Sequence, residues 1–244
     1  MKLTPKRTLP VLLLSVAFTV LAFGCERMPT AQEIAMEIAI DKYNEGVGLG
    51  ERGEYDAAIE LFSEAIRLNP KYAEAYGKRG IAWGRKEQHD KAIADYDEAI
   101  RLNSNYALAY YNRGFAWGAQ GQHDKAIADF SEAIRLNPEF VEAYGYRGNA
   151  WFAQGQLDKV IADFSEVIRL NPKDAKAYGN RGVAWGRKGQ HDKAIADFSE
   201  AIRLNPKDAK AYGNRGISWD AAGEPEKAAA DFQKAKELGV VPPK

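Results

Sequence analysis

The sequence predicts an all-α protein: an elongated solenoid of six helix-turn-helix repeats. Asparagine recurs every 34 residues, glycine recurs at the same interval, and no insertion interrupts the period over residues 39–242. A period of 34 residues is typical of stacked helical hairpins, each of which buries its apolar face against its neighbours. The recurring residues are Asn69, Asn103, Asn137, Asn171 and Asn205, and Gly46, Gly80, Gly114, Gly148, Gly182 and Gly216.

Residues 1–24 have the pattern of a secretory signal peptide. The basic residues Lys6 and Arg7 precede an apolar run over residues 9–23, and the polar Glu26 follows soon after it. The run is about 15 residues long, whereas crossing a bilayer takes roughly 18 to 20. We therefore expect the leader to be removed.

Cys25 is the only cysteine, so the chain cannot form an intramolecular disulfide. Residues 21–25 resemble a bacterial lipobox, in which the cysteine is acylated and becomes the new N-terminus. This resemblance implies a lipid anchor at Cys25 in the bacterial cell envelope, and Glu26 in second place resembles lipoproteins of the outer membrane facing the periplasm. Ala22 stands where a lipobox favours leucine, and an ordinary leader cleaved near Gly24 is the alternative.

The remaining chain divides by the period. Residues 25–38 are expected to form the anchored N-terminus, a short linker to about Thr30 and a lead-in helix, and residues 243–244 a tail. The six units occupy residues 39–72, 73–106, 107–140, 141–174, 175–208 and 209–242.

The second unit, residues 73–106, shows how each repeat is built. Residues 87–90 form a turn between two helices, and we expect Asp90 to cap the second one. A terminal Asn-Pro pair closes most units, because proline cannot continue a helix, and Asn103 followed by Ser104 is the exception. Helical spacing places Ala75, Tyr76, Arg79, Gly80, Ala82 and Trp83 on one stripe, and Ala92, Ile93, Tyr96, Ala99 and Ile100 on another.

These residues resemble the tetratricopeptide repeat (TPR). Counted from the first residue of a unit, that pattern asks for aromatic residues at positions 4, 11 and 24, small ones at 8, 20 and 27, and proline at 32. The resemblance covers residues 39–242 and implies a right-handed superhelical solenoid. We expect Gly80 and its small neighbours to make room for Tyr76 and Trp83. The five tryptophans at position 11 are then core residues: Trp83, Trp117, Trp151, Trp185 and Trp219.

The two terminal units depart from the pattern as capping repeats do. The first has Lys42 for tyrosine and Leu49 for tryptophan, and the last has Ala229 and Lys236 where other units have isoleucine. The array is therefore expected to end at six units.

Arginine at position 7 and aspartate at position 23 occur together in units two to six, and the first unit lacks both. We predict that the two side chains form a charge-assisted bond across the paired helices. The pairs are Arg79 and Asp95, Arg113 and Asp129, Arg147 and Asp163, Arg181 and Asp197, and Arg215 and Asp231.

Charge and motifs favour neither a catalyst nor a nucleic-acid partner. The 34 basic and 34 acidic residues balance, and removing the leader with its three cations leaves a net charge of −3. Glu74 and Glu142 share position 2 with Lys176 and Lys210, so there is no continuous basic track. No nucleophile with histidine and acid and no phosphate loop is present. We expect no enzyme, cofactor, metal or small-molecule substrate.

The resemblance implies that the first helices line a concave groove, to which positions 2, 5, 6, 9, 12 and 13 contribute. Position 9 is an apolar stripe broken by Asn149, and positions 5 and 12 are mostly glycine, which predicts an open groove suited to a peptide. In the alternative, position 9 is half-buried between first helices and is structural. The candidate groove residues are Val47, Ile81, Tyr111, Phe115, Asn149, Phe152, Lys176, Asn180, Lys210 and Asn214.

Some TPR proteins hold the C-terminal carboxylate of a partner with five lysine, asparagine and arginine residues. Units four to six supply Asn149, Asn180 and Lys210 in matching positions, but Gly145 and Asn214 stand where a lysine and an arginine are expected. Chance recurrence of asparagine at position 6 is the alternative explanation.

These patterns predict a non-catalytic protein-protein interaction scaffold of the bacterial cell envelope, which binds partner peptides or proteins. An adaptor or accessory subunit of an envelope enzyme or secretion complex is the alternative. A self-assembling structural array is disfavoured by the polar last helix.

Overall fold

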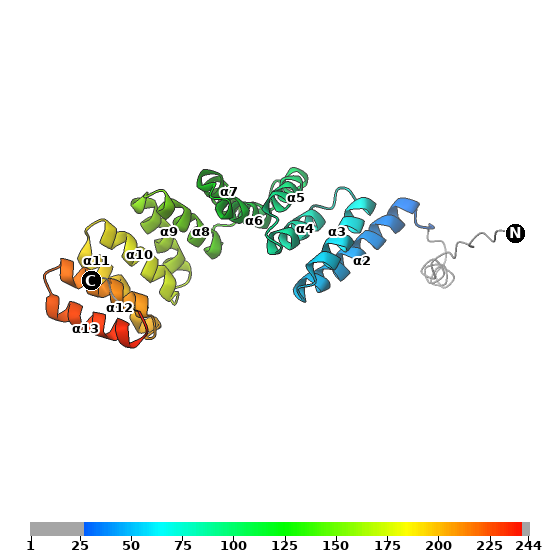
Figure 1. Ribbon diagram of the computed structural model, residues 1–244. Coiled ribbons are helices and arrows are strands. Elements are labelled where there is room, and N and C mark those ends of the chain that lie inside the picture. The colour runs from blue at the N-terminus through cyan, green and yellow to red at the C-terminus, as the bar shows by residue number, and fades with distance from the viewer. Residues whose placement is uncertain (1–26, 241–244) are drawn as a thin grey trace.

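The computed structural model describes residues 27–240, which form twelve α-helices and no strand. Consecutive helices pair into hairpins that follow one another along an elongated, curved array, with α2 at one end and α13 at the other (Figure 1). This confirms the predicted all-α superhelical solenoid. Cys25, the leader and residues 243–244 lie outside the described residues. The helices are α2 (Ala31–Glu51), α3 (Tyr55–Leu68), α4 (Ala73–Arg85), α5 (His89–Leu102), α6 (Ala107–Ala119), α7 (His123–Leu136), α8 (Val141–Ala153), α9 (Leu157–Leu170), α10 (Ala175–Arg187), α11 (His191–Leu204), α12 (Ala209–Ala221) and α13 (Pro225–Glu237).

The lead-in helix and the first helix of unit one are one continuous helix, α2. Thr30 caps it by accepting a hydrogen bond from the backbone N–H of Glu33, and the Glu33 carboxylate accepts one from the backbone N–H of Thr30. This reciprocal capping box satisfies two donors that the helix itself cannot, so the sequence fixes where α2 begins.

The turn inside each unit needs a left-handed residue at position 15. Glycine supplies it in five units, at Gly53, Gly121, Gly155, Gly189 and Gly223. In unit two the residue is Glu87, whose φ of 58° is the only positive value of a non-glycine residue between residues 27 and 240. A side chain disfavours this conformation, so the second turn is strained relative to the others.

Asp90 does not cap α5, contrary to the expectation from its position in the turn. Gln88 is the N-cap and makes no side-chain capping bond. Asp90 lies in the first turn of α5, where its Oδ1 accepts a 2.7 Å hydrogen bond from Nε2 of Gln120 in the next unit. Gln154 donates an equivalent hydrogen bond to Asp124. At the same repeat positions in other units, Lys86 forms an ion pair with Asp56, and Lys188 with Asp158. The aspartate therefore ties neighbouring units together.

Asparagine, and not proline, is the constant element where one unit meets the next. The Oδ1 atom of Asn103 accepts a 3.0 Å hydrogen bond from the backbone N–H of Asn105, although Ser104 follows it. Asn69, Asn137, Asn171 and Asn205 make the same bond two residues on. This local bond forms the turn with or without proline.

The close approach of paired helices depends on a different residue pair than expected. A Cβ atom added to Gly80 would lie 2.7 Å from Cε1 of Tyr96, so the aromatic residue at position 24 takes the space that glycine leaves, and not Tyr76 or Trp83. The other units repeat this contact, for example Gly46 with Phe62 at 2.8 Å. Any side chain at position 8 would push the two helices apart.

The tryptophans are half-buried, so the prediction that they belong to the core is wrong in part. Trp151 and Trp185 pack at the edge of the core. The lysine of position 19 lies over the ring of all five tryptophans; Nζ of Lys159 lies 3.8 Å from the ring centre of Trp151. A cation over an aromatic face is favourable, and the aliphatic part of lysine shields the ring from water.

The predicted arginine-aspartate pairs are confirmed in all five units. In unit four, Nε and Nη2 of Arg147 donate to the two carboxylate oxygens of Asp163 at 2.9 and 2.7 Å. Nη1 of Arg147 also donates to Oγ of Ser131 in the preceding unit at 3.0 Å. Each arginine therefore joins two units, a role that pairwise sequence comparison did not reveal.

Unit two supplies an aspartate where units one, three, four and five supply this serine. Asp97 accepts a 2.6 Å bond from Nη1 of Arg113, which also holds Asp129. The bonds with Asp129, and to a lesser degree with Asp97, raise the pKa of the Arg113 guanidinium. Burial raises the pKa of the Asp129 carboxyl, although Arg113 opposes this effect.

The outer face of the last unit is polar, as predicted. Ile195 and Ile202 in unit five are 8% and 9% exposed, and α12 of the following unit packs against their helix, α11. Their counterparts Ala229 and Lys236 are exposed on the outer face of α13. The final helix thus presents a polar face to water.

Candidate functional site

The stripe at position 9 divides into half-buried and exposed residues. Val47, Ile81 and Val183 are half-buried, as the structural alternative expected. Phe115 and Ile217 are 48% and 44% exposed, and Asn149 is exposed too. Large apolar side chains that stay in water are candidates for contact with a partner.

Phe115 belongs to an aromatic group at the centre of the first-helix surface, which we call the central aromatic cluster: Tyr111, Phe115 and Tyr146. The ring of Tyr146 lies 5.3 Å from that of Phe115 and 5.8 Å from that of Tyr111, in edge-on geometry. Edge-on contacts between aromatic rings are favourable, so the three rings hold one another in place.

Tyr146 was not among the predicted groove residues, although it is 39% exposed and central to the cluster. A signal existed in the sequence: position 6 carries asparagine in units one, three, five and six, lysine in unit two, and an aromatic residue only here. Its role depends on Tyr111 and Phe115 in the neighbouring unit, which is a contact between helices α6 and α8.

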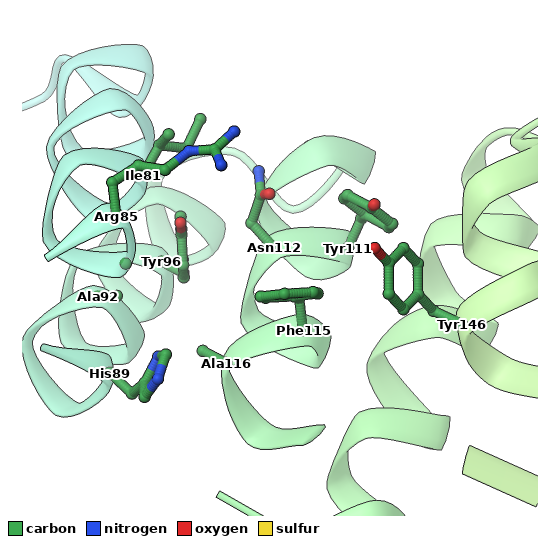
Figure 2. A pocket seen from close by; sticks show the side chains of 11 residues that line it. Ile81, Arg85, His89, Ala92, Tyr96, Tyr111, Asn112, Phe115, Ala116 and Tyr146 are labelled. Atoms are coloured by element: carbon green, nitrogen blue, oxygen red, sulfur yellow. The ribbon is translucent and has the colours of Figure 1, made fainter. Parts of the chain in front are cut away.

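A cavity of about 260 Å³ lies beside the cluster, between α4, α5 and α6. Ile81, Phe115 and Tyr146 supply apolar walls, while Arg85 and Asn112 supply polar groups at its rim (Figure 2). This combination of apolar walls and a few polar groups is typical of a site for a side chain of a partner.

Tyr111 lines the cavity, and its hydroxyl can act as a hydrogen-bond donor. Burial, chiefly, and the neighbouring Tyr146 and Glu142 raise its pKa to about 12. Its hydroxyl therefore stays protonated at physiological pH, so it can donate to a carbonyl or carboxylate oxygen.

The floor of the groove in units one to three is filled and not bare, which corrects the expectation of an open, glycine-lined surface. An aromatic residue at position 34 covers position 5 of the same unit. Tyr72 lies 5.0 Å from Tyr43 between ring centres, and Phe140 lies 4.7 Å from Tyr111. Gly77 is buried beneath the ring of Tyr106. A Cβ added to Gly77 would lie 3.0 Å from that ring. The glycine at this point makes room for a tyrosine.

In units four and five the floor is open, as predicted. A Cβ added to Gly145 or Gly179 would meet nothing within 4 Å. Position 34 is aspartate here: Oδ1 of Asp174 accepts bonds from the backbone N–H groups of Lys176 and Ala177, and Asp208 does the same for α12.

The polar candidates lie on this open part. Lys176, Asn180 and Lys210 are exposed, and Asn214 is half-buried. Among the described residues, no hydrogen bond or ion pair joins the side chains of Asn149, Asn180 and Lys210. Binding of a terminal carboxylate by these residues stays a prediction.

Phe152, the remaining aromatic candidate, is half-buried on α8, and the guanidinium of Arg187 lies over its ring. The Cζ atom of Arg187 lies 4.3 Å from the centre of the Phe152 ring. Arg187 also lines a cavity of about 240 Å³ with Val183, Asn214 and Ile217.

Residues 27–240 contain neither a cluster of metal ligands nor a membrane-spanning helix. No three histidine, cysteine or acidic side chains there converge as ligands of a metal ion. None of the twelve helices described is both long and apolar enough to span a bilayer.

Comparisons with known proteins agree with this architecture. A family model described as tetratricopeptide repeat matches residues 107–140, 141–174 and 175–208, and a second, described as TPR repeat, matches residues 49–86 and 85–121. The comparison with curated proteins returned no match.

Among solved structures, the chain is similar to YrrB, described as a TPR protein with an unusual peptide-binding site. The identity is 25%, the TM-score is 0.69, and the match covers 74% of this chain and 93% of YrrB. MamA is 26% identical with a TM-score of 0.66, covering 68% of this chain and 91% of that one. PilF of Pseudomonas aeruginosa, at 17% identity, a TM-score of 0.70 and coverage of 84% and 93%, shares the fold. The chain belongs to the tetratricopeptide repeat family.

Proposed function

We propose that this protein is a non-catalytic scaffold of the bacterial cell envelope that binds peptide segments of partner proteins in its concave groove. The TPR fold supports protein-protein interaction. The observation that carries the proposal is the central aromatic cluster, where Phe115 and Tyr146 stay exposed beside a cavity on the first-helix surface. The exposed parts of these rings leave apolar surface in water, and a bound peptide would bury it.

The similarity to YrrB supports the same reading, because that protein is described as having a peptide-binding site. The helical surface here offers apolar contact, a phenol donor at Tyr111 and amide groups at Asn112 and Asn149. These groups suit the mixed apolar and hydrogen-bonding character of a peptide backbone with side chains.

The groove is tested with peptides selected from a random display library against the wild-type protein. We expect Phe115→Ser to weaken the selected peptides by about tenfold or more, because a central aromatic anchor contributes about 2 kcal/mol or more. The matched control is Met36→Ser, since Met36 is also about half exposed, at 46%, but lies in α2 ahead of the first unit. Equal loss in both variants, or a library without binders, would contradict the proposal.

The envelope location rests on the sequence pattern of residues 1–25. Acylation of Cys25 with two or three chains would anchor the scaffold stably, and Cys25 lies ahead of helix α2, which begins at Ala31. We expect Cys25→Ser to leave the protein in the soluble extracytoplasmic fraction, or as uncleaved precursor, with the same far-ultraviolet circular dichroism. Acylated, membrane-bound protein from this variant would refute the anchor.

A further inference from the structure

The arginines of the described chain fall into two classes. Twelve of the fourteen have a carboxylate within ion-pair distance. The other two, Arg85 and Arg187, have no carboxylate at that distance between residues 27 and 240. Both stand at position 13 of their unit, near the end of a first helix.

Both arginines border the cavities of the groove. Arg85 lines the cavity beside the central aromatic cluster and also a second cavity of about 300 Å³, which it shares with Val47, Lys78 and Glu51. Glu51 is the acidic residue among those that line this second cavity, and it forms no ion pair with Arg85 in the described chain. In Figure 2 the guanidinium of Arg85 extends toward Asn112 at the open rim. Arg187 lies over Phe152 and lines the cavity that contains Ile217.

The two arginines flank the aromatic residues along the array. Position 13 is arginine only in units two and five; elsewhere it is glutamate in unit one and alanine in units three, four and six. The central aromatic cluster belongs to units three and four, which lie between them. Packed helices stand about 8 to 10 Å apart, so three unit steps separate the arginines by about 25 to 30 Å. An extended chain of about eight or nine residues covers that distance.

We infer that the groove takes an extended acidic peptide, with a carboxylate near each end and one large apolar side chain between them. This deepens the proposed function and rests on it. The apolar side chain enters the cavity between Ile81, Phe115 and Tyr146, and the carboxylates bind Arg85 and Arg187. A guanidinium forms strong charge-assisted bonds with a carboxylate, and elsewhere in this chain arginine is paired in that way.

Single-stranded nucleic acid is the competing occupant, since it also combines negative charge with groups that stack on aromatic rings. The groove disfavours it. Glu74 and Glu142 are exposed at position 2 of units two and four and form no ion pair in the described chain, so they would repel a continuous phosphate backbone. Two separated carboxylates avoid this repulsion.

The test uses a fluorescein-labelled nonapeptide, acetylated and amidated, with glutamate at both ends, phenylalanine in the centre and glycine and serine elsewhere. Matched peptides replace both glutamates with glutamine, or the phenylalanine with alanine. Fluorescence anisotropy at low salt should show that either replacement weakens binding to the wild-type protein by about tenfold. Arg85→Gln and Arg187→Gln should each weaken the acidic peptide several-fold and leave the glutamine peptide unchanged.

The control variant is Arg101→Gln. Arg101 is exposed on α5, where it pairs with Glu98, and it lines none of the groove cavities described above. We expect its loss to leave all three peptides unaffected.

Three results would overturn the inference. These are equal binding of the acidic and glutamine peptides, an equal effect of Arg85→Gln and Arg101→Gln, and tighter binding of a nine-nucleotide single strand than of the acidic peptide. If charge has no effect while library peptides still depend on Phe115, this inference fails and the proposed function stands. If neither the nonapeptides nor any library peptide binds, both fail.

Discussion

The groove floor of units one to three and that of units four and five differ because of one repeat position. Position 34 is Tyr72, Tyr106 and Phe140 in the first group and Asp174 and Asp208 in the second. The aromatic residues fold back over position 5 of their own unit, whereas the aspartates cap the following helix and leave Gly145 and Gly179 open. The residue at position 34 thus decides whether position 5 lies under an aromatic ring of the same unit or stays open.

An aromatic residue and an aspartate at position 34 also stabilise the array in different ways. A partly buried aromatic side chain contributes about 2 kcal/mol through apolar burial, and a helix cap contributes about 1 kcal/mol through hydrogen bonds. The first half is therefore expected to be the more stable part, and the open second half the part that exchanges more readily. Variants at the junction of the halves, or in one half alone, should therefore change their stabilities by different amounts.

The largest effect is expected where the two halves join. Arg147 binds Ser131 in unit three and Asp163 in unit four, and the side chains of Arg147 and Asp163 are only 19% and 6% exposed. Arg147→Ala leaves a buried carboxylate without its counter-charge, which costs about 3 to 5 kcal/mol. Urea denaturation should show the loss, and hydrogen exchange should show the halves unfolding separately.

The matched control is Arg169→Ala, because Arg169 is 61% exposed and pairs with Glu166 on the same helix, where the loss should stay below about 1 kcal/mol. Asp163→Asn alone and combined with Arg147→Ala completes a double-mutant cycle. Additive losses in that cycle would mean that the two side chains do not stabilise each other.

Removing the aromatic residue at position 34 should make the first half exchange its amide hydrogens as readily as the second. Phe140→Ala uncovers Tyr111 and should cost about 2 kcal/mol, less than for a fully buried phenylalanine because Phe140 is half-buried. Hydrogen exchange should accelerate in α6 and remain unchanged in α12. Equal acceleration in both helices would indicate that the cover does not act locally.

A smaller effect is expected from the caps of the second half. Asp174→Ala removes the acceptor for the backbone N–H groups of Lys176 and Ala177, at a cost of about 1 kcal/mol. Asp174→Asn keeps an acceptor oxygen and should retain most of the stability. A loss of the same size in both variants would assign the effect to charge and not to capping.

The smallest effect is a gain. Glu87 holds a φ of 58° in the turn of unit two, so Glu87→Gly should stabilise the first half by about 0.5 to 1 kcal/mol. Gly121→Ala is the reverse control: Gly121 has a φ of 73° and an added Cβ would meet nothing within 4 Å, so only the backbone is strained. If both variants have no effect on the urea midpoint, the turn carries no strain.

Regular features of the repeat were predictable because they recur in step. The 34-residue period, the helix pairs and the arginine-aspartate bonds follow from comparing one unit with the next, and the structure confirms them. Exposed candidates such as Phe115 followed from the groove positions of the family, and their role in binding stays a prediction. Tyr146 and the aromatic covers were missed, because each occurs in only some units and acts through a side chain elsewhere in the array.

The sequence by itself determined the period, the number of units and the polar outer face of the last helix. These are local or repeated signals, and a helix or a cap depends on residues a few positions apart. Only the tertiary structure decided which glycine faces an aromatic ring and which faces open space, as Gly77 and Gly179 show. It also decided that, among the arginines of residues 27–240, only Arg85 and Arg187 have no carboxylate within ion-pair distance. Both outcomes depend on the distance between side chains of different helices, and residue identity does not specify that distance.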